Sequence, residues 1–305
     1  MLRYAITRLL SVIPTLLLVM AVTFALVHAA PGGPFDSERS LPPEMQARLE
    51  ASYGLDQPIW KQFFNYLGGL AQGDLGPSFR YRQLDVSELI GDAIPVSATL
   101  GLLALVLGTL VGAAAGIYSA LRQNRVSDHV VMTLAMTGIS VPSFVIAPIL
   151  VLVFAIMLDW LPASGIHSPL HYILPVISLA LPLAAYVARL MRASFLEIMK
   201  SQFIRTARAQ GLSSKTIVFR YALKPALIPV VSFLGPAIAG LLSGSVVIEQ
   251  IFNIPGLGRH FIQGALNRDY TLVMGLVIFY STILILLNLL VDLLYAVLDP
   301  RVRYQ

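Results

Sequence analysis

Long apolar runs constrain the fold of this chain more than any other feature of its sequence. A helix needs about 20 apolar residues to cross a lipid bilayer. Six stretches qualify: Leu9–Val27, Val96–Leu121, Val130–Leu158, Tyr172–Ala188, Ile228–Ile248 and Leu272–Leu298. Only 12% of the residues are charged, whereas soluble domains have about 25%. The sequence therefore predicts an all-α polytopic membrane protein with six transmembrane helices.

Two of these stretches need comment. The first follows Arg3 and Arg8 and ends in "LVHAAPGG", which resembles a signal peptide with its cleavage site. A signal sequence has an apolar core of only about 7–15 residues, so we expect Leu9–Val27 to remain as a transmembrane helix. The fourth stretch contains Pro175 and Pro182, which membrane helices tolerate when neighbouring groups satisfy the freed carbonyls.

The distribution of Lys and Arg predicts the orientation. Positive charge gathers on the cytoplasmic side of membrane proteins, and here it gathers in alternate loops. Those loops and ends carry Arg3 and Arg8, Arg122 and Arg125, the eight cations from Arg189 to Lys224, and Arg301 and Arg303. The short loops of the opposite side carry only Arg259 and Arg268. Both termini are therefore expected in the cytoplasm.

These boundaries predict three parts. They are an N-terminal transmembrane helix (1–30), a periplasmic cap loop with short helices (31–94), and a five-helix core (95–305) with a cytoplasmic loop at 189–227. Within the cap, helices are expected over Glu44–Tyr53 and Ile59–Leu70, with a turn at Gly73 and Gly76. In the core, Gly108, Gly112 and Gly116 form a smooth strip along one helix face, which favours close packing against another helix of the same chain.

Several function classes find little support. The chain has no cysteine, and it contains neither an H-E-x-x-H zinc motif nor a G-x-S-x-G nucleophile motif. We therefore expect no catalytic residue and no metal site, and we read the five histidines as isolated side chains at span ends and in loops. The net charge of +5 lies beside apolar spans, so nucleic acid is not an expected partner.

The source of energy is constrained as well. No Gly-Lys pair occurs, so the chain has no phosphate-binding loop of the G-x-x-x-x-G-K-[ST] type, and any ATP must be bound by another chain. An ion-coupled secondary transporter is the alternative. Such proteins usually carry ionisable groups near the middle of the membrane, whereas the four lysines lie outside the predicted spans and Asp159, Glu249 and Asp292 lie near span ends.

The stretch "FIRTARAQGLSSKTIVFRYALKP" (Phe203–Pro225) carries five Lys and Arg and no acid. We expect one helix over Ser194–Gln210, which ends at Gly211 as a C′ residue. Ser213 or Ser214 would cap a second helix over Lys215–Leu223, which should not continue smoothly through Pro225. Such a rigid helix–Gly–helix elbow suits docking to another protein.

Within this elbow, "RTARAQG" resembles the cytoplasmic loop motif of ABC importer permeases, written Glu-Ala-Ala, three residues, Gly, although Arg205 and Thr206 replace the first Glu and Ala. Other segments resemble the branch of that family which handles dipeptides, oligopeptides and nickel. They include "APGGPF", "YGLDQPIWKQF", "GDLGPSF", "VPSFVIAP", "GSVVIEQIFNIPGLG" and "LDPRVRY". "ERSLPPE" and "QGDLGPSFRYR" most resemble the B-type permease subunits of oligopeptide importers.

The resemblance implies a permease of the bacterial inner membrane that moves peptides, most closely oligopeptides, from periplasm to cytoplasm, with a dipeptide or nickel permease as the alternative. It implies four kinds of partner: a second homologous permease subunit, two ATPase subunits that bind ATP and Mg, a periplasmic peptide-binding protein and the lipid bilayer. The chain itself would need no cofactor.

Three sets of site residues follow. The resemblance assigns ATPase docking to Arg205, Thr206, Ala207, Arg208 and Gly211. Position and broken backbone, together with the resemblance, suggest contact with the binding protein at Asn253, Pro255, Gly256, Gly258 and Arg259. Polar residues and a proline within the spans suggest a translocation path along Ser140, Pro142, Ser143, Ser243 and Ser245.

Overall fold

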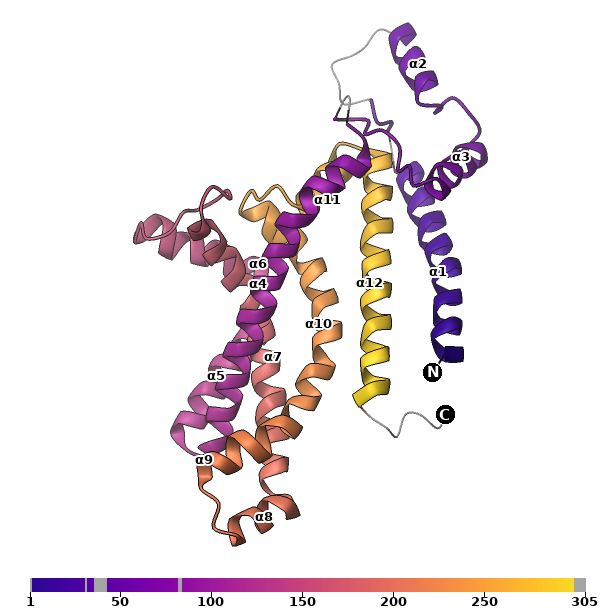
Figure 1. The fold of residues 1–305 in the computed structure, drawn as a ribbon. Coiled ribbons are helices and arrows are strands. Elements are labelled where there is room, and N and C mark those ends of the chain that lie inside the picture. The colour runs from indigo at the N-terminus through magenta and orange to yellow at the C-terminus, as the bar shows by residue number, and fades with distance from the viewer. Residues whose placement is uncertain (1, 31, 36–42, 82–83, 299–305) are drawn as a thin grey trace. The chain divides into compact units, whose positions relative to one another are not determined.

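The computed structural model describes residues 2–30, 32–35, 43–81 and 84–298 (Figure 1). Five helices are long and apolar enough to cross a membrane: α1 (Leu2–Ala29), α4 (Val86–Leu121), α7 (Ile173–Met199), α10 (Leu223–Ile251) and α12 (Tyr270–Leu298). A bent helix pair adds a sixth span if it is counted as one. Across the described ranges, the β-structure is a single isolated bridge between Pro77 and Asp85. The predicted all-α membrane fold is confirmed.

The third predicted span is broken, not continuous. Helix α5 (Val126–Ser140) and the unit formed by α6 (Ser143–Leu150) and η1 (Val151–Met157) meet at an angle of 105°. Pro142 causes the break, because proline has no N–H and disfavours helical backbone in the residue before it. Val141 is accordingly extended, with φ −97° and ψ 120°. The expectation of one helix over Val130–Leu158 is therefore wrong at this point.

The chain divides into two compact units, 1–96 with 255–305, and 97–254. In the first unit, α1 packs against α12. The two predicted short helices of the cap are present as α2 (Pro43–Ser52) and α3 (Ile59–Ala71). Gly73 and Gly76, with φ of +81° and +82°, make the predicted turn. The three-part division by membrane boundaries stays a prediction, and part of its cap loop, residues 36–42 and 82–83, lies outside the described residues.

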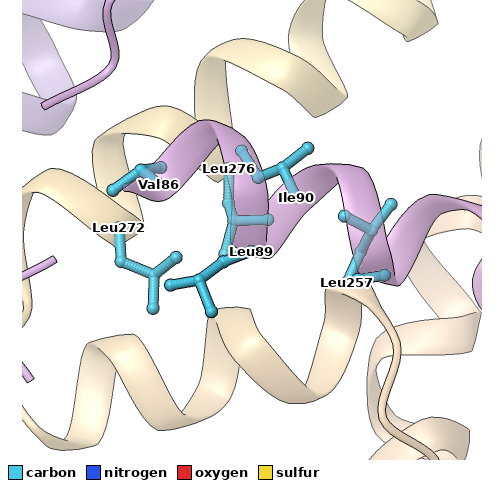
Figure 2. Close-up of a cluster of buried hydrophobic side chains, with 7 residues drawn as sticks. Val86, Leu89, Ile90, Leu257, Leu272 and Leu276 are labelled. Carbon is cyan, nitrogen blue, oxygen red and sulfur yellow. The ribbon is translucent and has the colours of Figure 1, made fainter. Parts of the chain in front are cut away.

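A buried apolar cluster organises this first unit (Figure 2). It joins the start of α4, the short helix α11 (Leu257–Leu266) and the first turns of α12. Its members are Val86, Leu89, Ile90, Ala93, Leu257, Leu272 and Leu276. Fully burying an aliphatic side chain stabilises a fold by about 1.5–3 kcal/mol in water. The cluster therefore fixes α11 against α12.

Asp269 fastens the cap loop to the start of α12. Its carboxylate is fully buried and accepts hydrogen bonds from the Ser78 hydroxyl and, at 3.2 Å, from the backbone N–H groups of Phe79 and Arg80. The same carboxylate accepts a hydrogen bond from the N–H of Leu272, also at 3.2 Å, and so caps α12. A buried carboxylate needs such partners to offset its desolvation.

In the second unit, α5, α6 and α10 pack around α7. Of the most apolar stretch of α7, 61% is buried, compared with 11–29% for the other four long helices. The glycine strip of α4 also lies against α7, because a Cβ atom on Gly112 would stand 2.5 Å from the Ala184 carbonyl oxygen. On Gly116 it would stand 2.6 Å from that of Ala188. The predicted packing within the chain is confirmed.

Candidate functional site

The basic elbow begins with the short amphipathic helix α8 (Gln202–Ala209). Ile204 and Ala207 are buried, with exposed fractions of 0% and 3%. Arg205 and Thr206 are exposed on the opposite face, whereas Arg208, which is also exposed, lines a cavity beside α8. Of the five predicted docking residues, Ala207 thus anchors the helix, and Arg205 and Thr206 form its outer surface.

Gly211 ends α8 as predicted, but the expected single helix over Ser194–Gln210 is wrong, because α7 continues to Met199 and α8 begins separately at Gln202. Its φ is +78°, in the left-handed region that glycine adopts without strain. The N–H of Gly211 donates to the carbonyl of Arg208 at 3.0 Å, and the N–H of Leu212 donates to that of Ala207 at 3.3 Å. These two bonds are the 5→2 and 6→1 pair of a Schellman motif. The elbow therefore has one defined backbone geometry.

The second helix of the elbow starts at a side-chain cap. The Ser213 hydroxyl accepts a hydrogen bond from the N–H of Thr216 at 3.3 Å, so Ser213 is the N-cap. The helix does not end at Pro225, as the sequence suggested. It continues without interruption as α9 (Ser214–Thr216), the π-helix η3 (Ile217–Ala222) and α10.

The π-helix accounts for this continuity. A proline in an α-helix collides with the carbonyl four residues earlier, which for Pro225 belongs to Tyr221. Tyr221 lies in η3, whose wider turn replaces the usual hydrogen-bond ladder with longer-range bonds. The second helix of the elbow is thus the start of one long helix that includes α10.

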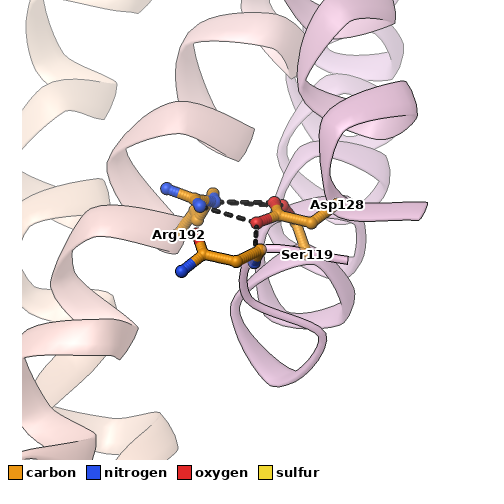
Figure 3. A network of polar contacts seen from close by, with 4 residues as sticks. Ser119, Asp128 and Arg192 are labelled. Carbon is orange, nitrogen blue, oxygen red and sulfur yellow. Dashed lines mark hydrogen bonds and ion pairs between the residues drawn. The ribbon is translucent and has the colours of Figure 1, made fainter. Parts of the chain in front are cut away.

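A buried ion pair holds together the helix ends next to the elbow (Figure 3). Arg192 of α7 donates from Nε and Nη2 to the two carboxylate oxygens of Asp128, at 2.8 and 2.7 Å. The hydroxyl of Ser119, at the end of α4, and the N–H of Asn124, at 2.9 Å, also donate to this carboxylate. Asp128 is 1% exposed and the Arg192 side chain 26%. The network thus ties α4, α5 and α7.

Sequence analysis missed this network, because both charged residues fall just outside the predicted spans. Arg192 was counted only as one of the eight cations from Arg189 to Lys224. The usable signal was a single acid, Asp128, two residues into an apolar helix. Such an acid needs a partner on another helix.

The predicted path residues have different environments. Ser140 and Pro142 are exposed at the break between α5 and α6. Ser143 lines an apolar cavity of about 290 Å³ between α6, α7 and α10, together with Tyr186 and Phe233. Ser245 is buried, and its hydroxyl donates to the Leu242 carbonyl of its own helix at 2.9 Å. The side chain of Ser243 lies outside the described residues.

The residues predicted to contact a binding protein belong to both units. Asn253, in the second unit, is exposed and adopts a φ of +54°. In the first unit, Gly256 is the extended N-cap of α11, and Pro255 and Arg259 flank it. Gly256 and Gly258 are buried, whereas Pro255 is exposed and Arg259 is half-buried. The expected short helix after the broken segment is α11.

Two further observations concern a buried acidic residue and the arrangement of possible metal ligands. Glu249 is fully buried in α10 and accepts a hydrogen bond from the Ser97 hydroxyl of α4 at 2.8 Å. Because this contact joins two helices of the same unit, we assign Glu249 a structural role. Among the described residues, no three His, Cys, Asp or Glu side chains come close enough to hold a metal ion.

Comparison with protein families identifies the class of protein. Residues 108–304 match the family described as binding-protein-dependent transport system inner membrane component. Residues 1–101 match the N-terminal family of the same membrane components. The chain therefore belongs to the inner-membrane permease components of binding-protein-dependent ABC transport systems, and it is a multi-pass inner-membrane protein.

Individual relatives narrow the position within the family. The chain is 49% identical to the oligopeptide transport system permease protein OppB of Haemophilus influenzae and 50% identical to that of Salmonella typhimurium, over 100% of all three chains. It is 42% identical to the dipeptide transport system permease protein DppB of Bacillus subtilis, over 99% of this chain and 98% of that one.

Solved structures agree on the fold. A chain from the inward-facing structure of the MetNI methionine ABC transporter aligns with a TM-score of 0.57 and 16% identity. The alignment covers 70% of this chain and 97% of that one. A chain of an amino acid ABC transporter, crystallised with histidines, aligns with a TM-score of 0.53. This alignment covers 68% of this chain and 93% of that one. At these identities the likeness establishes the shared fold alone.

Proposed function

We propose that this chain is a membrane-spanning subunit of an ATP-driven importer and carries oligopeptides from the periplasm to the cytoplasm. The elbow is the observation that carries the proposal. A Schellman-capped helix presents Arg205 and Thr206 outward, and the second helix of the elbow continues into α10. That arrangement suits a lever on which an ATPase subunit acts.

The remaining partners complete the proposal. A second permease subunit of similar fold would pair with this chain, and two ATPase subunits with bound ATP and Mg would dock below them. A periplasmic binding protein would deliver peptide near Asn253, Pro255, Gly256, Gly258 and Arg259. ATP-driven closure of the ATPases would favour one permease conformation only if their contacts with the elbows differ between the two states.

The substrate class rests on the relatives. The oligopeptide permeases compared above share 49–50% of their residues with this chain, whereas the dipeptide permease shares 42%. A permease that binds its substrate weakly would leave the selection of peptides to the binding protein. The apolar cavity at Ser143, Tyr186 and Phe233 is a candidate wall of the path.

Charge reversal on α8 tests the proposal. Arg205→Glu places a carboxylate on the exposed face without disturbing Ile204, Ala207 or the cap at Gly211. Lys224→Glu is the matched control, because it makes the same charge change at an exposed position of α10. Both variants would be purified from membranes with their partners, and the amount of associated ATPase and the uptake of a labelled pentapeptide would be measured.

The expected result is loss of ATPase and of pentapeptide uptake for Arg205→Glu at wild-type yield of the permease, with both retained for Lys224→Glu. If a folded wild-type chain never brings down an ATPase, the proposal fails. If uptake persists after ATP depletion but stops with a protonophore, the protein is an ion-coupled transporter instead. If the protein transports dipeptides or Ni²⁺ but no pentapeptide, the proposed substrate class is wrong and the proposed importer function stands.

A further inference from the structure

A cavity of about 460 Å³ lies beside the elbow, within the second unit. Its walls are the end of α4 and the turn after it, the end of α7, and the elbow from α8 to η3. The lining residues with charged side chains are Arg122, Arg125, Lys200 and Arg208. Ligand pockets usually measure about 300–1,000 Å³, so this cavity is large enough for a small charged group.

The charge of this cavity is uncompensated. Among the residues that the structure describes, no acidic side chain lines it, and none of the four cations forms an ion pair with a described residue. The nearby carboxylate of Asp128 is already held by Arg192. Helices α4 and α7 end at the cavity, but each helix C-terminus supplies only about −0.5 charge. About three positive charges remain unbalanced.

The rest of the lining is mixed. Ala120, Leu121, Leu196, Met199, Ile217 and Val218 are apolar, whereas Gln123 and Ser214 are polar. Apolar walls lower the local dielectric constant and strengthen the attraction between the cations and an anion. Arg122 stacks on the ring of Tyr118, with its guanidinium carbon 4.8 Å from the ring centroid, and this contact holds the cation at the cavity mouth.

An apolar surface continues from the cavity along the neighbouring helices. Leu121 lines the cavity and is 53% exposed, and Val126 and Val130 of α5 are 79% and 51% exposed. A molecule with an anionic head and apolar chains matches this combination. We infer that the basic cavity lined by Arg122, Arg125, Lys200 and Arg208 binds the phosphate headgroup of an anionic phospholipid, whose acyl chains lie along α4 and α5.

This assignment rests on the proposed cytoplasmic placement of the elbow, which puts the cavity on the side of the inner leaflet. Basic pockets between transmembrane helices on that side suit anionic headgroups. A free phosphate ion offers the same charge but leaves the apolar surface beside the cavity uncovered. The lipid is therefore the source of phosphate to which we commit.

Lipid retention by the purified complex tests the inference. The complex would be mixed with phosphatidylglycerol or phosphatidylethanolamine of identical acyl chains, and bound lipid would be counted by native mass spectrometry. The test variant is Arg122→Gln/Arg125→Gln. The matched control is Arg220→Gln/Lys224→Gln, which removes the same charge at exposed positions outside the cavity lining. Parallel samples would contain 10 mM inorganic phosphate as a competitor.

The wild type should retain phosphatidylglycerol in preference to phosphatidylethanolamine. A cation near an anionic membrane surface contributes about 1 kcal/mol, so the test variant should bind phosphatidylglycerol about 30-fold more weakly. The control variant should change by less than about threefold, and phosphate should displace little lipid. Equal melting temperatures in phosphatidylethanolamine alone would establish that the test variant is folded.

Three results would overturn the inference. They are equal binding of the two lipids by the wild type, equal losses in test and control variants, and full displacement of phosphatidylglycerol by inorganic phosphate, which would assign the cavity to a soluble anion. ATPase recovered from the same samples separates this inference from the proposed function. Lipid retention without any ATPase would disprove the importer and leave the lipid site standing.

Discussion

The guanidinium of Arg192 grips the carboxylate of Asp128 through two hydrogen bonds of 2.8 and 2.7 Å and so joins α7 to the start of α5. Paired geometry of this kind is specific to arginine, whose planar fork matches a carboxylate. Ser119 adds α4 to the same contact. The three helix ends beside the elbow are therefore held as one rigid support.

Breaking this pair should destabilise the support. Asp128→Asn leaves Arg192 without its counter-charge, and loss of one partner of a buried pair costs about 3–5 kcal/mol. Because Arg192 is 26% exposed, we expect the lower end of that range or less. Thermal unfolding in detergent should show a clearly lower melting temperature. Glu197→Gln, an exposed acid on α7, is the control and should melt like the wild type; equal melting of both variants would contradict the prediction.

Close packing of α4 on α7 gives a second prediction. A Cβ on Gly112 would stand 2.5 Å from the Ala184 carbonyl oxygen and force α4 outward, and overpacking of this kind costs about 1–3 kcal/mol. Gly101, in the same helix, has no described atom within 4 Å of its Cβ position. Gly101→Ala should therefore be neutral or slightly stabilising. Gly112→Ala should lower the melting temperature, and a rise in both variants would exclude tight packing here.

A third prediction concerns the backbone of the elbow. Gly211 needs its φ of +78°, but open space surrounds its Cβ position, so a substitution meets only backbone strain. Alanine should cost about 1–2 kcal/mol there, whereas asparagine tolerates the left-handed region. Peptide-stimulated ATPase activity should therefore fall in Gly211→Ala and be largely retained in Gly211→Asn. Identical activities would mean that the cap geometry does not limit coupling.

The helices could be predicted from the sequence because their signals are local. Long apolar runs, the glycine at position 211 and the serine at 213 each act through neighbouring residues, and α7, the cap at Gly211 and the start of α9 follow from them. The break at Pro142 was missed because it does not depend on local sequence alone. Pro182 carries the same signal inside α7 and breaks nothing, because the surroundings of each proline decide its effect.

The parts of the site that escaped prediction depend on contacts between distant residues. Asp128 and Arg192 are 64 positions apart, and no local pattern links them. The passage of the helix through Pro225 depends on the π-helix at Ile217–Ala222, which no local pattern in the sequence predicted. The basic cavity likewise lies between α4, α7 and the elbow, and the positive charge in the sequence does not reveal that these segments enclose a cavity.

Histidine 260 gives a prediction of pH dependence. Burial and the neighbouring charge of Arg259 lower the pKa of His260, and Asp92 opposes this only in part. Because the folded state then binds fewer protons than the unfolded state, stability is complete above the unfolded pKa of about 6.5 and falls as the pH drops below it. Melting temperatures between pH 8 and pH 5.5 should decline less steeply for His260→Gln than for the wild type. Parallel curves would rule out His260 as a contributor.

Arg259 supplies the last prediction, which tests the proposed contact with the binding protein. Arg259 is half-buried near the start of α11, and its charge would attract an acidic partner surface. Arg259→Glu should reduce stimulation of ATPase activity by the peptide-loaded binding protein about tenfold, as loss of one interfacial charge pair would. The control is Lys61→Glu, the same charge change on the exposed surface of α3. Measurement at pH 8, above the ordinary histidine pKa of about 6.5, limits any contribution from the titration of His260. Assembly with the ATPase should survive in both variants, and normal stimulation of the Arg259 variant would remove this residue from the contact.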